Sequence, residues 1–149
     1  MHVRKIAIAL VLVAGCHSNT PDPGPDPDRE SGPDKERTAP RPIQLGALVT
    51  DEVDFDKGDM TDWKSLRLDK KGTLRVKLHW DNNQMDLNVD VFDRAGEPIA
   101  SSPGLLPGSA EKSVPVEIDA PGTYFIRVTA PRAHQASVYT LQAKWETTK

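Results

Sequence analysis

The stretch Thr73-Leu74-Arg75-Val76-Lys77-Leu78-His79-Trp80 decides the fold of this chain. Its apolar residues occupy every second position, and polar or charged residues stand between them. Because successive side chains of a β-strand point to opposite faces of the sheet, this alternation predicts a strand with one buried and one wet face. We expect His79 to lie on the wet face.

The same alternation recurs along the rest of the chain. It is clear in residues 87–91, 114–118, 124–128 and 139–145, and weaker near residues 44–49, 63–68 and 98–101. No stretch shows a convincing helical period. The sequence therefore predicts an all-β protein with about eight short strands.

Turn residues separate the expected strands. Asp69-Lys70-Lys71-Gly72, Asp93-Arg94-Ala95-Gly96 and Asp119-Ala120-Pro121-Gly122 have the composition of tight turns. Pro115 cannot donate a ladder hydrogen bond, which predicts an edge strand or a bulge there. Short strands at this spacing favour an antiparallel two-sheet sandwich.

One strand pairing follows from this reading. If residues 73–80 and 86–92 form a hairpin, Lys77 lies near Asp90. The polar residues between the two strands, Asp81, Asn82, Asn83 and Asp86, are then a hairpin-like loop.

Four segments of this domain resemble a known family in their order and spacing. They are Trp63-Lys64-Ser65-Leu66, residues 85–93, residues 120–128 and Tyr139-Thr140-Leu141. Across nearly all of residues 44–146 the chain resembles bacterial pre-peptidase C-terminal domains. The resemblance implies a jelly-roll-like β-sandwich. Such domains are commonly attached to secreted peptidases, and some relatives bind calcium, collagen or polysaccharide.

The N-terminus has the layout of a secretory signal peptide. Arg4 and Lys5 precede an apolar run over residues 6–13, which is shorter than the ~20 residues that a membrane-spanning helix needs. Leu12-Val13-Ala14-Gly15-Cys16 resembles the lipobox of bacterial lipoproteins. The alternative is an N-terminal strand or core helix that happens to end in cysteine.

The lipobox resemblance implies cleavage after residue 15 and acylation of Cys16. Two or three acyl chains make a stable membrane anchor, at about 0.8 kcal/mol per buried CH₂. His17 favours the outer membrane, since Asp at that position retains enteric lipoproteins in the inner membrane. We expect a lipid-anchored protein of the cell envelope.

Residues 16–42 alternate proline with charged residues and offer almost nothing to bury. Such a segment is expected to be a disordered, extended linker. An alternative is that residues 21–25 are a motif for a proline-binding groove. The expected organisation is a cleaved signal peptide over residues 1–15, a lipidated linker over 16–42 and a β-sandwich domain over 43–149.

An acidic run suggests a metal site. It comprises Asp51, Glu52, Asp54, Asp56, Asp59 and Asp62. Calcium prefers oxygen ligands, and we consider Asp54, Asp56 and Asp59 as its candidate ligands. The alternative is a solvated loop before a strand, because the run lacks the register of an EF-hand loop.

A second candidate is an apolar pair in a loop. Leu105 and Leu106 lie between Pro103-Gly104 and Pro107-Gly108. They either form a contact site at the loop tip or cover the open end of the sandwich.

Several function classes are not indicated. The sequence contains neither H-E-x-x-H nor G-x-S-x-G, and its expected domain holds only His79 and His134 as histidines. Cys16 is the only cysteine, so a disulfide within the chain and a cysteine zinc site are excluded. The net charge of -3 without a basic stripe makes nucleic acid an unexpected partner.

The sequence thus predicts a monomeric lipoprotein without catalytic activity. Its β-sandwich is expected to act as a binding or structural module for a protein or polysaccharide, with no cofactor unless the calcium reading holds. One alternative is an accessory or inhibitor subunit of a secreted peptidase. Another is a calcium-dependent polysaccharide-binding or protein-binding domain.

Overall fold

A computed structural model describes residues 34–102, 104 and 108–146. Nine strands lie in this part of the chain: β1 (Arg41–Ile43), β2 (Leu48–Asp54), β3 (Thr61–Leu68), β4 (Gly72–Trp80), β5 (Asn88–Phe92), β6 (Pro98–Ser101), β7 (Glu111–Ile118), β8 (Gly122–Thr129) and β9 (Ala136–Trp145). One 3₁₀ turn, η1 (Phe55–Lys57), follows β2. Within these residues, no helix has the length and apolarity to cross a membrane.

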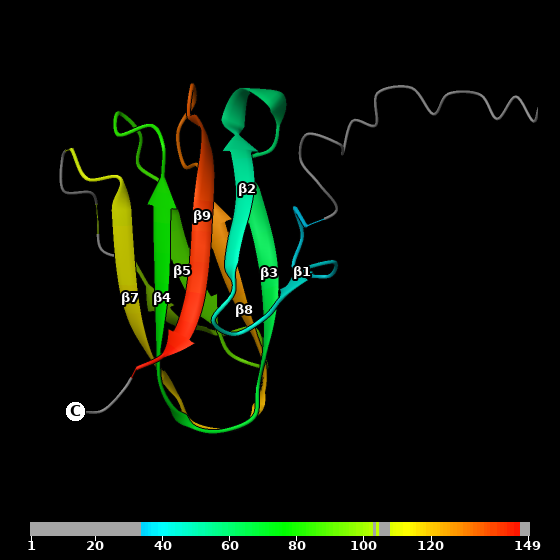
Figure 1. Cartoon of the computed structure of the whole chain (residues 1–149). Helices are drawn as coiled ribbons and strands as arrows, with labels where there is room; N and C mark the ends of the chain where they lie inside the picture. The colour runs from blue at the N-terminus through cyan, green and yellow to red at the C-terminus, as the bar shows by residue number, and fades with distance from the viewer. Residues whose placement is uncertain (1–33, 103, 105–107, 147–149) are drawn as a thin grey trace, which may run out of the picture.

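The strands form two layers (Figure 1). The five-stranded sheet has the order β1-β3-β8-β5-β6, and the four-stranded sheet has the order β2-β9-β4-β7. Every pairing is antiparallel except that of β1 with β3, which is parallel. The predicted all-β two-sheet sandwich is confirmed.

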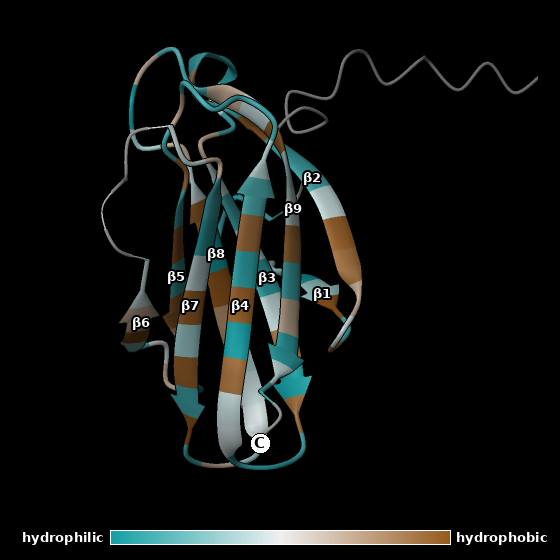
Figure 2. Cartoon of the chain, turned by 60° about the vertical axis from the view of Figure 1, so that its left-hand side comes forward, coloured by the Kyte–Doolittle hydropathy of each residue, from teal (hydrophilic) through white to brown (hydrophobic). Residues whose placement is uncertain are grey.

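The core lies between the two sheets. Brown and teal bands alternate along β4 in Figure 2, and its residues Leu74, Val76, Leu78 and Trp80 are completely buried. Buried apolar residues of the facing strands β3, β5 and β8 join them in a single cluster. His79 is exposed, as predicted, and Pro115 lies in β7 at the edge of its sheet, also as predicted.

The predicted hairpin between residues 73–80 and 86–92 is wrong. β4 belongs to the four-stranded sheet and β5 to the five-stranded sheet. Lys77 lies opposite Ser113 and Gln142, and Asp90 pairs with Arg127 at 2.8 Å.

The physical reason lies in the connection between β4 and β5. Met85 and Leu87 are buried, and the indole Nε1 of Trp80 donates to the carbonyl of Met85. Residues 81–87 therefore connect the two sheets, with residues 81–84 exposed and residues 85–87 buried, and do not form a hairpin loop.

The ordered domain also begins earlier than expected. Residues 34–42, which the composition placed in the linker, contain the first two residues of β1 and the buried side chain of Asp34. The backbone carbonyl of Asp34 accepts a hydrogen bond from Trp63 N at 2.6 Å. β1, the strand that pairs with this edge of β3, thus begins in a segment that has almost no apolar residues. Cys16, the signal peptide and most of the linker lie outside the described residues.

Candidate functional site

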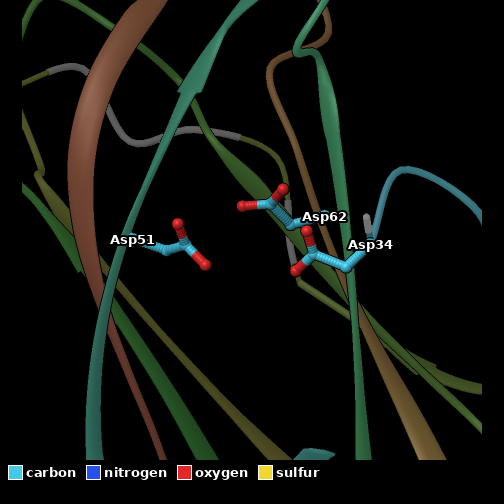
Figure 3. Close-up of side chains that lie close together, drawn as sticks. All are labelled: Asp34, Asp51 and Asp62. Atoms are coloured by element: carbon cyan, nitrogen blue, oxygen red, sulfur yellow. The ribbon is translucent and has the colours of Figure 1, made fainter. Parts of the chain in front are cut away.

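Part of the acidic run forms a buried cluster instead of a loop. Asp51 lies in β2 and Asp62 in β3, while Asp34 precedes β1. Carboxylate oxygens of these three residues, hereafter the carboxylate cluster, all lie within 4.8 Å of one another. Figure 3 shows them pointing toward a common space.

Lys64 reaches into this space from β3. The inward positions of β3 are Asp62, Lys64, Leu66 and Leu68, so the strand's alternation carries a lysine to the core. The side chain of Lys64 is fully buried. Its Nζ donates to Asp34 and, at 2.6 Å, to Asp51, and it lies 3.8 Å from Asp62.

The carboxylate cluster keeps Lys64 charged. Burial disfavours the ammonium form and is the largest single effect on its pKa. The charge of Asp62 and the hydrogen bonds and charges of Asp34 and Asp51 outweigh burial, so the pKa of Lys64 is raised above its ordinary value. The lysine is therefore a permanent internal cation at neutral pH.

Asp62 and Tyr139 extend the cluster toward β9. The hydroxyl of Tyr139 donates to Asp62 at 2.5 Å, and both side chains are buried. Burial raises the pKa of Asp62 to about 7, although Lys64 and the Tyr139 hydrogen bond act in the opposite direction. Burial also raises the pKa of Tyr139 well above its usual range, so its hydroxyl stays a donor.

Asp59 is a further buried carboxyl beside this cluster. Its side chain is 1% exposed, and its Oδ1 has no hydrogen-bond partner among the described residues. Burial, together with repulsion by Asp62, Asp34 and Asp51, raises the pKa of Asp59 to about 8. At neutral pH this side chain is mostly a neutral acid.

The three candidate calcium ligands are not brought together as a group. Asp54 caps η1 by accepting hydrogen bonds from the backbone of Asp56 and Lys57. Asp56 is exposed and contacts the loop residue His134, with 2.8 Å between Oδ2 and Nδ1. Among the described residues, the three-carboxylate group with metal-like spacing is Asp34, Asp51 and Asp62. The sequence could not reveal it, because Asp34 is distant in sequence and looked like linker.

A second feature lies on the outer face of the five-stranded sheet. Trp63, Phe92, Phe125 and Arg127 project from β3, β5 and β8 at positions between the inward ones, and we call them the aromatic–arginine face. The ring centroids of Trp63 and Phe92 are 4.9 Å apart. The Arg127 guanidinium lies 5.5 Å from the first ring and 5.2 Å from the second.

Asp90 holds Arg127 in this position. Its Oδ2 accepts hydrogen bonds from Nη2 at 2.8 Å and from Nε at 3.2 Å. The Arg127 side chain is 39% exposed, whereas Trp63 and Phe125 are half-buried. Arg37, from the segment before β1, lies over the ring of Phe125 at 5.8 Å. The face thus combines fixed aromatic rings with Arg127, and Arg37 adds a second guanidinium over one of the rings.

The aromatic–arginine face was not predicted from the sequence, although the sequence contains a pattern that indicates it. Large aromatic residues at positions 63 and 125 alternate with inward residues of the same strands. That pattern marks outward-facing rings once the strand register is known.

The remaining predicted residues are not part of either feature. His79 lines a shallow hollow of about 130 Å³ on the outer face of the four-stranded sheet, with Leu48, Lys77, Leu78, Glu111, Thr140 and Gln142. Leu105 and Leu106, the candidate contact loop, lie outside the described residues, so their role stays a prediction.

Comparison with known proteins identifies the fold. No protein-family model and no curated protein matches the chain. The pre-peptidase C-terminal domain of a Bacillus anthracis collagenase superposes with a TM-score of 0.59 at 13% identity, covering 70% of this chain and 93% of that domain. This likeness confirms the predicted resemblance as a similarity of fold.

A second solved structure is a periplasmic inhibitor of g-type lysozyme from Aeromonas hydrophila. It matches at 17% identity with a TM-score of 0.46, covering 71% of this chain and 95% of that one. A superposition this loose supports no conclusion about the present chain.

Proposed function

We propose that this chain is a cell-envelope lipoprotein whose β-sandwich is a non-catalytic binding module. The lipobox resemblance around Cys16 supports the lipid anchor. The aromatic–arginine face is the observation that supports binding. His17 favours the outer membrane as the site of anchoring, and no cofactor is required.

Aromatic and arginine side chains dominate the binding energy of many protein surfaces. A ring offers a large rigid contact area, and a guanidinium forms paired hydrogen bonds with carboxylate or phosphate. Arg127 uses Nε and Nη2 for Asp90, so that ion pair leaves Nη1 outside it. An anionic group that approaches the exposed guanidinium meets donors that are already oriented.

A polysaccharide with carboxylate or phosphate groups fits this face best. The apolar side of a sugar ring can contact the parts of the Trp63 and Phe125 rings that the guanidinium groups over them leave accessible. An acidic substituent of the same sugar can pair with Arg127. The rings of the face are fixed by the sheet, so little conformational entropy is lost on binding. The ligand is held in place without being chemically changed.

Co-sedimentation with insoluble envelope polysaccharide tests this function. In the Cys16→Ser chain, we expect Trp63→Ala and Arg127→Met each to weaken binding about tenfold or more. Lys77→Ala, on the exposed outer face of the other sheet, should leave binding unchanged. Equal binding by all four proteins would refute the aromatic–arginine face as the site. Selective capture of a secreted peptidase instead would favour the accessory-subunit alternative.

The anchor is tested separately in cells. We expect the natural chain to incorporate labelled palmitate and to fractionate with membranes, and Cys16→Ser to do neither. Palmitate incorporation by Cys16→Ser would contradict the assignment.

A further inference from the structure

The carboxylate cluster has the donor chemistry of a divalent-cation site. Asp34, Asp51 and Asp62 come from three separate segments and bring hard oxygen atoms within 4.8 Å of one another. Calcium is bound in proteins by oxygen sets of this kind. The question is whether the space between the oxygens can accept a metal.

The residues present do not fit a metal. The ammonium of Lys64 is bonded to Asp34 and, at 2.6 Å, to Asp51. It also lies 3.8 Å from Asp62, so a single cationic atom already contacts all three carboxylates. A divalent ion could enter only by displacing a fully buried, charged side chain.

We propose that Lys64 takes the place of a divalent cation, and that its ammonium ties the segment before β1 to β2 and β3 without a metal. This inference is independent of the proposed binding function, since it concerns the interior of the sandwich.

Removal of Lys64 would leave the carboxylate cluster with the following neighbouring charged groups. Arg41 pairs at 2.8 Å with Oδ2 of Asp51, the same oxygen that accepts from Lys64. Asp59 adds a further buried carboxyl with an unpartnered oxygen. Without Lys64, three carboxylates of the cluster would face a space lined by oxygen atoms. Such a space is the kind of site that calcium occupies.

The chain contains a matched control. Lys112 is also buried and its Nζ bonds Asp86 at 2.6 Å and Asn88 at 2.9 Å. Here one carboxylate and one amide surround the ammonium. Removal of Lys112 should therefore destabilise the fold without producing a cation site.

Thermal unfolding with and without calcium tests the proposal. We would compare the Cys16→Ser chain with its Lys64→Ala and Lys112→Ala variants, in chelator and in about 5 mM calcium. We expect no change of Tm for the parent. Lys64→Ala should lose Tm in chelator and regain at least half of the loss in calcium, with a saturable dose dependence. Lys112→Ala should lose Tm and regain none.

Terbium luminescence gives a second measurement. Tyr139 donates to Asp62, so terbium bound in the cluster of Lys64→Ala should be sensitised by excitation of this tyrosine, and terbium added to the parent should not. A saturable calcium-dependent rise of the parent's Tm that is lost in Asp51→Asn would overturn the proposal. So would a Lys64→Ala variant that calcium does not stabilise.

Discussion

Asp59 and Asp62 are the residues whose ionisation departs most from that of free aspartate. Their pKa values are raised from 3.8 to about 8 and about 7, so the folded protein holds protons that the unfolded chain has released at neutral pH. Stability therefore falls as pH rises through the window between the two states' pKa values.

The pH dependence is a testable consequence of these carboxyls. We expect the free energy of unfolding to decrease between pH 5 and pH 8, by at most about 1.4 kcal/mol per pH unit for each proton involved. Urea unfolding across this range measures it. Asp59→Asn should flatten the slope and be more stable than the parent at pH 8.

Asp56→Asn is the control for that measurement. Asp56 is exposed, and hydrogen bonds from His134 lower its pKa, so it does not bind a proton in this window. Stability that rises from pH 5 to pH 8 in the parent would contradict the raised pKa values.

The Tyr139 hydroxyl makes a different prediction. Tyr139→Phe leaves a buried oxygen of Asp62 without its donor, and we expect a loss of about 1–3 kcal/mol in the free energy of unfolding. In Tyr124→Phe the loss should be smaller, because the partner Asp119 is exposed and Ala120 is half-buried, so water can replace the hydroxyl. Chemical denaturation compares the two variants, and equal losses would argue against a special role for the buried pair.

Among the elements, β1 depends on the carboxylate cluster. It is three residues long, pairs with β3 alone, and follows a segment that Asp34 fixes through Lys64. Asp34→Ala should therefore loosen residues 34–43 without unfolding the sandwich. We expect trypsin to cleave after Arg37 about tenfold faster, which corresponds to about 1.4 kcal/mol of local stability.

Thr38→Ala provides the comparison for the proteolysis. Thr38 is exposed and bonds only to the exposed Glu36 among the contacts described. Cleavage rates that are the same in both variants would show that Asp34 does not hold this segment.

The strands differ in how well their sequences predict them. β4 and β6 were predicted closely, because the first alternates strictly and the second is bounded by turn residues. β3 was predicted more weakly, over residues 63–68, since its inward positions include Asp62 and Lys64. β1 was not predicted, because its segment alternates proline with charged residues and Ile43 is its one apolar residue packed against the core.

Sheet assignment was the harder part of the fold. A tight-turn composition at residues 69–72 and 119–122 does not distinguish a hairpin from a connection between sheets, and both stretches join the two layers. The aromatic–arginine face depends on this assignment, because β3, β5 and β8 are neighbours only in the sheet. Along the chain, other strands lie between β3, β5 and β8.

For the whole molecule, a single core shared by both sheets predicts cooperative unfolding. Trp80 lies in the core and Trp63 on the outer face of the other sheet, so the two indoles report on both layers. We expect tryptophan fluorescence and far-ultraviolet circular dichroism to give coincident denaturation curves. Separate transitions would show that the two sheets unfold independently.

The position of Asp34 also sets how the molecule responds to tension. A pull on the chain preceding residue 34 reaches the sandwich first at the Asp34 carboxylate and at its backbone bond to Trp63, before it reaches the short ladder of β1. The load then passes through Lys64 into β3, an inner strand of its sheet. The buried ion pair between Asp34 and Lys64 thus bears the load first. The force at which this ion pair breaks sets the tension that the domain withstands before β1 separates from β3.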